Sequence, residues 1–403
     1  MDLAELRSRL GSNDEIAVID TRDHTTYAAG HLIAASHVPL DELAETIGPL
    51  VPRNDTPIVV SDGSSQPLSV LTSLGYTDLH VLAGGLDAWV HAGGELFSGQ
   101  YVASKALGEL VETGCDTPSL DVAEVNRRRA EGDDLVILDS RPIEEYRART
   151  IPGAVCVPGA ELVHRVRDLA PHPDTTVLVS CGGRTRSIIG AQSLINAGLP
   201  NPVAAVENGT MGWTLAGLDV ETDADRIGPE PSEDARMWSA EAAARVRERY
   251  RLEITDETVL ADWVADPSRT TFVFDVRTPE EYSAGHLPGA RWAPGGQLVQ
   301  ATDTWMATRN ARVVLTDDDG VRATMTAHWL DQLGWTDTVV LPTDPKSRTA
   351  TGADPTAPSP SRAPLAGTST SDDPLQRFRD YLSWELGLVD QVARDGTSAF
   401  NVR

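Results

Sequence analysis

Cysteine is scarce in this sequence, with three residues among 403: Cys115, Cys156 and Cys181. A small, odd number excludes a framework of disulfide bonds and is typical of proteins in a reducing compartment. The amino-terminal stretch MDLAELRSRL has neither the basic start nor the apolar centre of a secretory signal peptide. No apolar run approaches the roughly 18 residues that a membrane-spanning helix needs. We therefore expect a cytoplasmic protein that does not bind a membrane.

Positive charge is also in short supply, because 34 Lys and Arg stand against 60 Asp and Glu, a formal net charge of −26. Nucleic acids and anionic membranes are bound through basic surfaces, so this balance argues against both as partners. The nine histidines and three cysteines show no paired metal-ligand spacing. A nucleotide-binding loop of the type Gly-x4-Gly-Lys is missing as well. We expect neither a metal nor an organic cofactor.

The sequence does contain one pattern in three copies, which is its most informative feature. Each copy opens with a short apolar strand that ends in Asp-x-Arg; the three aspartates are Asp20, Asp139 and Asp275. A second apolar strand ends 42 residues after that aspartate in every copy, at Asp62, Cys181 and Asp317. A helical segment follows, with a glycine near its end. Equal spacing in three copies is hard to obtain by chance, and it aligns Cys181 with two aspartates.

Strands that alternate with helices predict parallel sheets covered by helices on both faces. The predicted fold class is therefore α/β, with three tandem domains over residues 1–98, 115–222 and 237–345. Residues 346–373 are rich in Pro, Ser, Thr and Ala, a composition typical of a flexible, disordered linker.

The C-terminal segment 374–403 is predicted to be a helix. Asp373 and Pro374 suit a helix start. An apolar stripe follows at helical spacing, formed by Leu375, Phe378, Leu382, Leu386 and Val389. The simpler interpretation is that this stripe docks on the chain's own domains. The second is that the helix forms a homodimer or binds another partner.

Cys181 lies where a predicted parallel strand ends and a helix begins, in the stretch VLVSCGGRTRSIIG. Such sheets place their sites at this edge, and the amides of a glycine-rich turn can form a nest for an anion. The helix dipole adds positive potential. Gly182 and Gly183 permit the turn, Arg184 and Arg186 bring cations, and Ser187 can cap the helix. Together these features favour a thiolate or persulfide that faces an anionic substrate.

The other two cysteines lack such surroundings. Cys115 lies in a Thr-Gly-Cys-Asp connection without basic neighbours, and Cys156 alternates within GAVCVP as a small core residue does. Buried structural cysteines are common. We therefore expect chemistry at Cys181 and structural roles at Cys115 and Cys156.

The Asp-x-Arg strand with its Glu-Tyr and Pro-Gly-Ala, the cysteine loop, and the closing NGTMGW together resemble rhodanese domains. The likeness covers three copies, strongest in the middle one, and leaves the linker and the C-terminal segment outside. The chain resembles multidomain bacterial rhodanese-related sulfurtransferases. This resemblance implies a five-stranded parallel sheet in each domain. It also implies an enzyme that takes sulfane sulfur from a donor such as thiosulfate, holds it as a cysteine persulfide, and passes it to cyanide or a thiol.

The resemblance implies specific roles in the middle copy. Cys181 is the sulfur carrier, and the substrate-binding loop comprises Gly182, Gly183, Arg184, Thr185 and Arg186. Its backbone amides are expected to face the sulfur, and the two arginines to bind the oxyanion end of the donor.

Residues around the loop are expected to support it. Asp139 lies at a neighbouring strand end and Ser187 in the helix that follows the loop. Arg141 is predicted to pair with Glu145 and so hold the domain together. Trp213 is expected in the core or in the wall of the pocket.

The copies depart from the pattern in ways that matter. Asp62 and Asp317 replace the cysteine in the outer copies, and an aspartate cannot carry sulfane sulfur. Both outer domains are therefore expected to be inactive scaffolds. In the middle copy, the Gly-His of the outer copies is replaced by Arg149-Thr150, which indicates a changed contact beside the site.

Two other functions stay open at this point. A non-enzymatic sulfur-relay or binding module is consistent with the loss of cysteine from two copies. A cysteine phosphatase or arsenate reductase shares the fold but needs Cys-x5-Arg, where this sequence has Ser187. For the transferase, the donor is left open between thiosulfate and 3-mercaptopyruvate.

Overall fold

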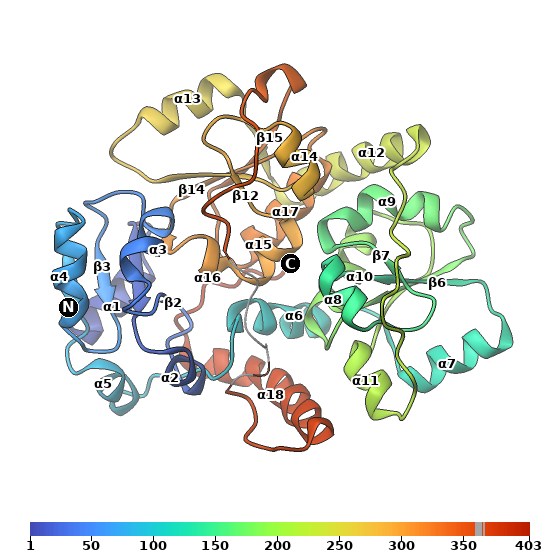
Figure 1. Cartoon of the computed structure of the whole chain (residues 1–403), viewed down its shortest axis with the longest axis horizontal. Coiled ribbons are helices and arrows are strands. Elements are labelled where there is room, and N and C mark those ends of the chain that lie inside the picture. Colours follow the sequence, from blue (N-terminus) through green and yellow to red (C-terminus); the bar gives the residue numbers. More distant parts are fainter. Residues whose placement is uncertain (359–364, 366) are drawn as a thin grey trace.

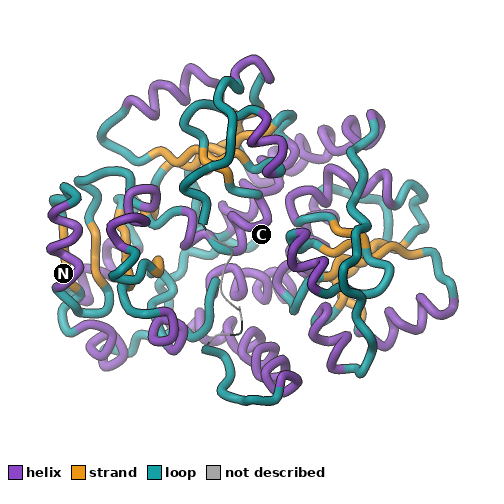
Figure 2. The backbone as a smooth tube through the Cα atoms, in the orientation of Figure 1, coloured by secondary structure: helices purple, strands orange, loops and turns teal. Residues whose placement is uncertain are grey.

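The computed structural model describes residues 1–358, 365 and 367–403. Its strands form three separate groups, one for each copy of the sequence pattern (Figure 2). Three α/β domains surround α6, Val102–Cys115, which joins the first domain to the second (Figure 1). The prediction of three tandem α/β domains is confirmed.

The middle domain contains a parallel sheet with the strand order β5-β9-β8-β6-β7. The strands are β5 Ser119–Leu120, β6 Leu135–Asp139, β7 Val155–Cys156, β8 Thr176–Ser180 and β9 Val203–Val206. The helices are α7 Val122–Glu131, α8 Ile143–Ala148, α9 Leu162–Leu169, α10 Thr185–Asn196 and α11 Gly209–Leu215. Asp139 of β6 is in register with Ser180 of β8. Asp139, the last residue of β6, and Cys181, which follows β8, therefore lie at neighbouring strand ends.

The third domain repeats this topology in the order β10-β15-β14-β11-β12. Its strands are β10 Glu253–Ile254, β11 Thr271–Asp275, β12 Arg291–Trp292, β14 Arg312–Asp317 and β15 Thr338–Pro342. Its helices are α12 Glu233–Tyr250, α13 Glu257–Ala265, α14 Pro279–Ala284, α15 Gly295–Gln300, α16 Thr302–Trp305 and α17 Val321–Gln332. Asp317 ends β14 as Cys181 follows β8, so the alignment of the two copies is preserved in space.

The first domain departs from the expectation of five parallel strands. Its own strands are β1 Ile16–Asp20, β2 Ser36–His37, β3 Ile58–Val60 and β4 Leu79–Val81. Its helices are α1 Leu3–Leu10, α2 His24–Ala29, α3 Leu43–Leu50, α4 Gln66–Ser73 and α5 Gly85–His91. The fifth strand, β13 Thr308–Arg309, comes from the third domain and pairs antiparallel with β1. An open sheet edge is covered in this way by another part of the chain.

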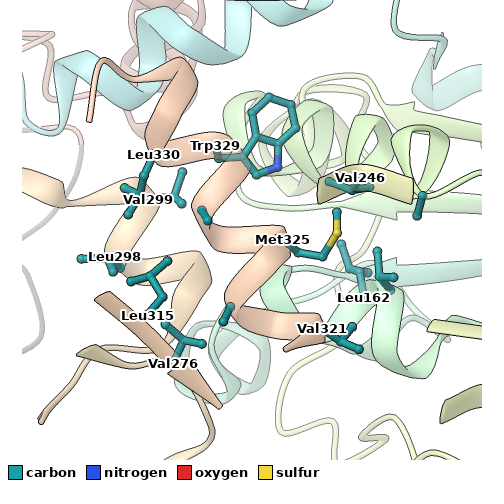
Figure 3. Close-up of a cluster of buried hydrophobic side chains, with 14 of the residues drawn as sticks. Leu162, Val246, Val276, Leu298, Val299, Leu315, Val321, Met325, Trp329 and Leu330 are labelled. Atoms are coloured by element: carbon teal, nitrogen blue, oxygen red, sulfur yellow. The ribbon is translucent and has the colours of Figure 1, made fainter. Parts of the chain in front are cut away.

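The middle and third domains share one hydrophobic core, which Figure 3 shows in close-up. Met325 and Trp329 of α17 face Leu162 of α9 and Val246 of α12 (Figure 3). The Trp329 indole donates a hydrogen bond of 2.8 Å to Ser193 Oγ of the middle domain. Because apolar burial is the main stabilising term in folding, the shared core favours a fixed arrangement of the two domains.

The C-terminal helix α18 spans Pro374–Asp395, so the prediction of a helix through residue 403 is wrong. Gly396 adopts a left-handed conformation there and ends the helix. The predicted apolar stripe is also wrong in part, because Leu375 and Leu386 are exposed. The buried residues are Phe378, Tyr381, Leu382, Glu385, Leu388, Val392 and Asp395. Neither α18 nor any other described helix is long and apolar enough to cross a membrane.

The segment predicted as a flexible linker, 346–373, includes residues 359–364 and 366, which lie outside the described residues. Its described parts contact the domains. His286 N donates to Ala350 O at 2.9 Å, and Trp292 N donates to Asp354 Oδ2 at 2.9 Å. Residues 350–354 thus lie along the third domain, and α18 packs against α6 and α11.

Candidate active site

Cys181 lies in the short loop between strand β8, which ends at Ser180, and helix α10, which begins at Thr185. The residue is 2% exposed, and its Sγ lies 3.7 Å from Ser187 Oγ. Ser187 was predicted to cap α10, but the N-cap residue is Arg184. The Ser187 hydroxyl instead donates to Arg184 O at 2.7 Å. It therefore fixes the turn of the loop from inside the helix and contacts the sulfur from there.

The carbonyl groups of the loop are held by the start of α11. Thr210 N donates to Cys181 O at 2.9 Å, and Met211 N donates to Gly182 O at 3.0 Å. Gly209, at φ +49°, makes this approach possible, because a Cβ there would lie 2.2 Å from Cys181 O. Within the described part of the chain, the N–H groups of Gly182 and Gly183 donate no hydrogen bond. These amides are therefore available to an anion.

Both arginines of the loop are already paired with carboxylates. Arg184 donates to Glu109 of α6 at 2.7 and 2.9 Å and also contacts Glu112. Arg186 donates to Glu145 at 2.8 and 2.7 Å. Burial alone would lower the pKa of Arg186, but the Glu145 carboxylate holds it above its ordinary value. The charges of both arginines are thus largely compensated before any substrate arrives.

The predicted pairing of Arg141 with Glu145 is wrong. Arg141 donates instead to Asp139, at 2.9 and 2.7 Å, because its Asp-x-Arg spacing brings the two side chains together at one strand end. The Thr150 hydroxyl donates to Asp139 Oδ2 at 2.7 Å. Thr150 stands where the outer copies have His31 and His286, which bind backbone carbonyls. The substitution therefore adds a fourth hydrogen-bond donor to Asp139, beside the backbone N, Nε and Nη2 of Arg141.

Comparison with known proteins identifies the family to which this chain belongs. The profile described as "Rhodanese-like domain" matches residues 2–92, 121–216 and 258–343. The chain belongs to this family. A crystal structure of thiosulfate sulfurtransferase from Pseudomonas aeruginosa is 37% identical, covers 100% of this chain and 99% of its own, and superposes with a TM-score of 0.93.

Two curated relatives match parts of the rhodanese chain. SseB of Mycobacterium tuberculosis is 29% identical over 201 residues, which is 40% of this chain and 70% of SseB. Thiosulfate sulfurtransferase GlpE of Pseudomonas fluorescens is 36% identical over 76 residues, 18% of this chain and 68% of GlpE. The chain is therefore similar to sulfurtransferases both in its whole architecture and in single segments.

The remaining cysteines and Trp213 occupy strand, helix and core positions in and next to the middle rhodanese domain. Cys156 is buried in β7, and burial raises its pKa to about 12. Cys115 ends α6, and its pKa is raised by partial burial. Trp213 packs in the core of the domain and donates to Asp219 O at 3.0 Å. These surroundings suit structural roles.

In the outer rhodanese domains, an aspartate carboxylate occupies the loop. Asp317 accepts hydrogen bonds from Gly320 N at 2.6 Å and Ala323 N at 3.0 Å. Asp62 accepts from Ser64 N at 2.8 Å and from the Thr21 hydroxyl at 2.7 Å. In both outer domains, the side chain at the cysteine position thus accepts hydrogen bonds from amides of its own loop.

Asp317 gives a prediction for the pH dependence of stability. Burial raises the pKa of its carboxyl to about 6, above the 3.8 of an exposed aspartate. The folded state therefore favours the protonated form, and this contribution to stability is lost as the pH rises through that range. Relative to the wild type, Asp317→Asn should gain about 2–3 kcal/mol of unfolding free energy between about pH 4 and pH 7. Urea titrations of both proteins at both pH values measure this difference. If the unfolding free energies of the wild type and Asp317→Asn change equally between the two pH values, the prediction is wrong.

Two elements outside the rhodanese repeats complete the surroundings of Cys181. From α6 come Lys105 and Glu109, which are 4% and 3% exposed, and from α18 come Tyr381 and Glu385, which are 3% and 0% exposed. Our sequence analysis missed all four. Neither segment belongs to the repeated pattern, and a search for an apolar helix face passes over a buried glutamate.

A small cavity of about 40 Å³ borders the loop between the middle and third domains. Its lining includes Ser104 of α6, Thr185 and Arg186 of α10, and Gly295 and Gly296 of α15. Cys181 is not part of the lining, so the cavity reaches the loop from the α10 side. Among the described residues, no group of three or more His, Cys, Asp and Glu could hold a metal ion.

Proposed function

We propose that this protein is a sulfurtransferase whose middle domain moves sulfane sulfur from thiosulfate, or a similar anionic donor, to a thiol or cyanide. The carrier is a persulfide on Cys181. One observation carries the proposal: a cysteine stands at the head of a loop whose Gly182 and Gly183 amides find no acceptor among the described residues. Similarity to the thiosulfate sulfurtransferase of Pseudomonas aeruginosa over the whole chain supports the same donor class.

The proposed reaction has two displacement steps, as covalent catalysis by a thiolate requires. In the first, the Cys181 thiolate attacks the outer sulfur of thiosulfate. A new S–S bond forms, the S–S bond of thiosulfate breaks, and sulfite leaves with the bonding electron pair. In the second, cyanide or a thiolate attacks the terminal sulfur of the persulfide. The electron pair of the broken bond returns to Cys181, and thiocyanate or a new persulfide is released.

The loop supplies the electrostatic conditions for both steps. The N-terminus of α10 and the free amides lie beside the sulfur, and such groups stabilise anions. Arg184 and Arg186 hold the shape of the loop through their carboxylate partners. The outer domains, with aspartates at the cysteine position, serve as scaffold. A reducing compartment such as the cytoplasm fits three cysteines that are all free.

The two alternative functions, a cysteine phosphatase and a sulfur-relay module, would require different features at this site. A phosphatase loop needs an arginine at position 187, where the Ser187 hydroxyl instead faces Arg184 O. A sulfur-relay module is favoured by one observation, the burial of Cys181 at 2% exposure, which suits a partner that opens the site. Faster turnover with a protein acceptor than with small thiols would identify such a relay.

Incubation with thiosulfate is expected to add one sulfur atom to the intact chain, because the thiolate displaces sulfite. Cyanide or a thiol should remove that sulfur. Intact-protein mass spectrometry measures the gain, and peptide mapping should place it on Cys181. No gain in a protein whose Cys181 still reacts with an alkylating agent would contradict the proposed donor.

A further inference from the structure

The carboxylates around the cysteine loop are not equivalent. Glu109 and Glu112 hold Arg184, and Glu145 holds Arg186. Glu385, from α18, makes no ion pair with an arginine among the described residues. An anionic donor that enters this site must find a cation whose charge is still available, and neither arginine of the loop offers one.

Lys105 is such a cation. It is 4% exposed, and within the described residues its ammonium group makes no ion pair and no hydrogen bond. It lies on the face of α6 that meets the loop, because Gly108 and Glu109 are three and four residues further on. A Cβ on Gly108 would be 3.0 Å from Thr185 Cα, and Glu109 binds Arg184. Lys105 therefore continues this contact face by one turn.

Lys105 lies among the titratable groups of the site. Burial lowers the pKa of Lys105 and so does Arg186, while Glu385, Cys181 and Glu145 act in the opposite direction. The chain has only two lysines, Lys105 and Lys346. Of these two lysines, Lys105 is buried at the contact between α6 and α10, whereas Lys346 is exposed.

Glu385 places its carboxyl group against the cysteine loop. Its Oε1 accepts from Thr185 N at 3.4 Å and also from the Thr185 hydroxyl. Its Oε2 is buried without a hydrogen-bond partner, and a Cβ on Gly183 would lie 3.4 Å from it. In the third domain, the Asp317 carboxylate also accepts from loop amides, although from different positions, Gly320 N and Ala323 N. Asp317 is part of the loop that it binds, whereas Glu385 lies on the separate helix α18.

We propose that Lys105 binds the anionic end of the sulfur donor beside Cys181, and that the Glu385 carboxylate occupies this anion site until the donor replaces it. The inference rests on the proposed function and assigns the donor's binding group within it. The donor displaces a carboxylate that has no arginine partner, so no ion pair of the loop has to break. A lysine and a carboxylate from outside all three rhodanese repeats thus select for an anionic donor.

The test compares steady-state kinetics of the full chain with thiosulfate and with an uncharged organic trisulfide. Lys105→Met should raise the KM for thiosulfate by about tenfold or more, since a charge-assisted contact is lost. It should change the KM for the trisulfide by less than about twofold. Lys346→Met, at the exposed second lysine, is the matched control and should match the wild type. Glu385→Gln should lower the KM for thiosulfate, because the competing charge is removed.

A binding measurement separates this inference from the proposed function. Calorimetric titration of Cys181→Ser with thiosulfate reports binding without sulfur transfer, and adding Lys105→Met should weaken it by about tenfold. If the wild type gains sulfur and Lys105→Met leaves the KM for thiosulfate unchanged, the role of Lys105 is overturned. If the wild type takes no sulfur and Cys181→Ser binds no thiosulfate, the proposed function fails and this inference with it. Should Lys105→Met not fold, an unchanged or raised KM for thiosulfate in Glu385→Gln overturns the inference.

Discussion

Replacement of Cys181 by serine is expected to reduce sulfur transfer at least about a thousandfold, to the level of the uncatalysed reaction. A serine hydroxyl is a much weaker acid than a thiol, and its oxygen forms no persulfide. Because the Cys181 side chain is small and Ser187 lies 3.7 Å away, serine fits the same space. The loss should therefore appear in kcat, with the fold intact. Thiocyanate formation from thiosulfate and cyanide, with circular dichroism alongside, measures both quantities.

The other two cysteines provide matched controls for this prediction. Cys115→Ser and Cys156→Ser should retain transfer, because the high pKa that burial gives Cys156 and the place of Cys115 at the end of α6 keep both thiols out of the reaction. Cys156→Ser is expected to cost some stability, since a polar group then stands in a core position. Activity that survives in Cys181→Ser, or disappears in Cys115→Ser, would show that the carrier has been assigned to the wrong residue.

Replacement of Arg322 by methionine should produce the largest loss of stability, about 3–5 kcal/mol of unfolding free energy. Arg322 is 1% exposed and donates to Glu161 at 3.0 Å, Glu281 at 2.7 Å and Asp318 at 3.1 Å. Burial alone would raise the pKa of Glu161, but Arg322 and Arg165 hold it below its ordinary value. Without Arg322, the buried Glu161 of the middle domain and the partly exposed Glu281 and Asp318 of the third lose their shared counter-charge.

The measurement is the urea midpoint of the transition that unfolds the middle and third domains together. Arg127→Met serves as the control, because Arg127 also binds two carboxylates, Glu124 and Glu131, but on the surface of α7. Surface ion pairs contribute about 0–1 kcal/mol, so this variant should stay close to the wild type. Equal, small losses in both variants would mean that the Arg322 cluster does not stabilise the contact between the domains.

Much of the fold could be predicted because its signals are local. The apolar strands, the glycines after each helix and the 42-residue spacing determine the order of elements, and parallel topology then places Asp139 and Cys181 at neighbouring strand ends. The prediction for α18 was only partly right, because only some of its features are local in the sequence. Its helical period is visible in the sequence, but its buried face includes Glu385, which an analysis of apolar positions cannot select.

The strand β13 shows a second limit. Two residues of the third domain, Thr308 and Arg309, complete the sheet of the first domain against β1. Such a short strand carries no alternation of apolar and polar residues, and its partner lies nearly 300 positions away. Pairing of this kind depends on which sheet edge remains open after the domains have packed, and the repeated pattern contains no information on it.

By itself, the sequence determined that three rhodanese copies exist, that one retains a cysteine, and that this cysteine heads a glycine-rich turn at the carboxyl edge of a sheet. These properties depend on residues close to each other along the chain. Only the tertiary structure decided which charges remain available there. Glu109 and Glu385 reach the loop from 75 and 200 residues away, and Lys105 lies beside it because α6 packs against α10. Electrostatic interactions depend on distance in space and on burial, so the charge of the site was settled by packing.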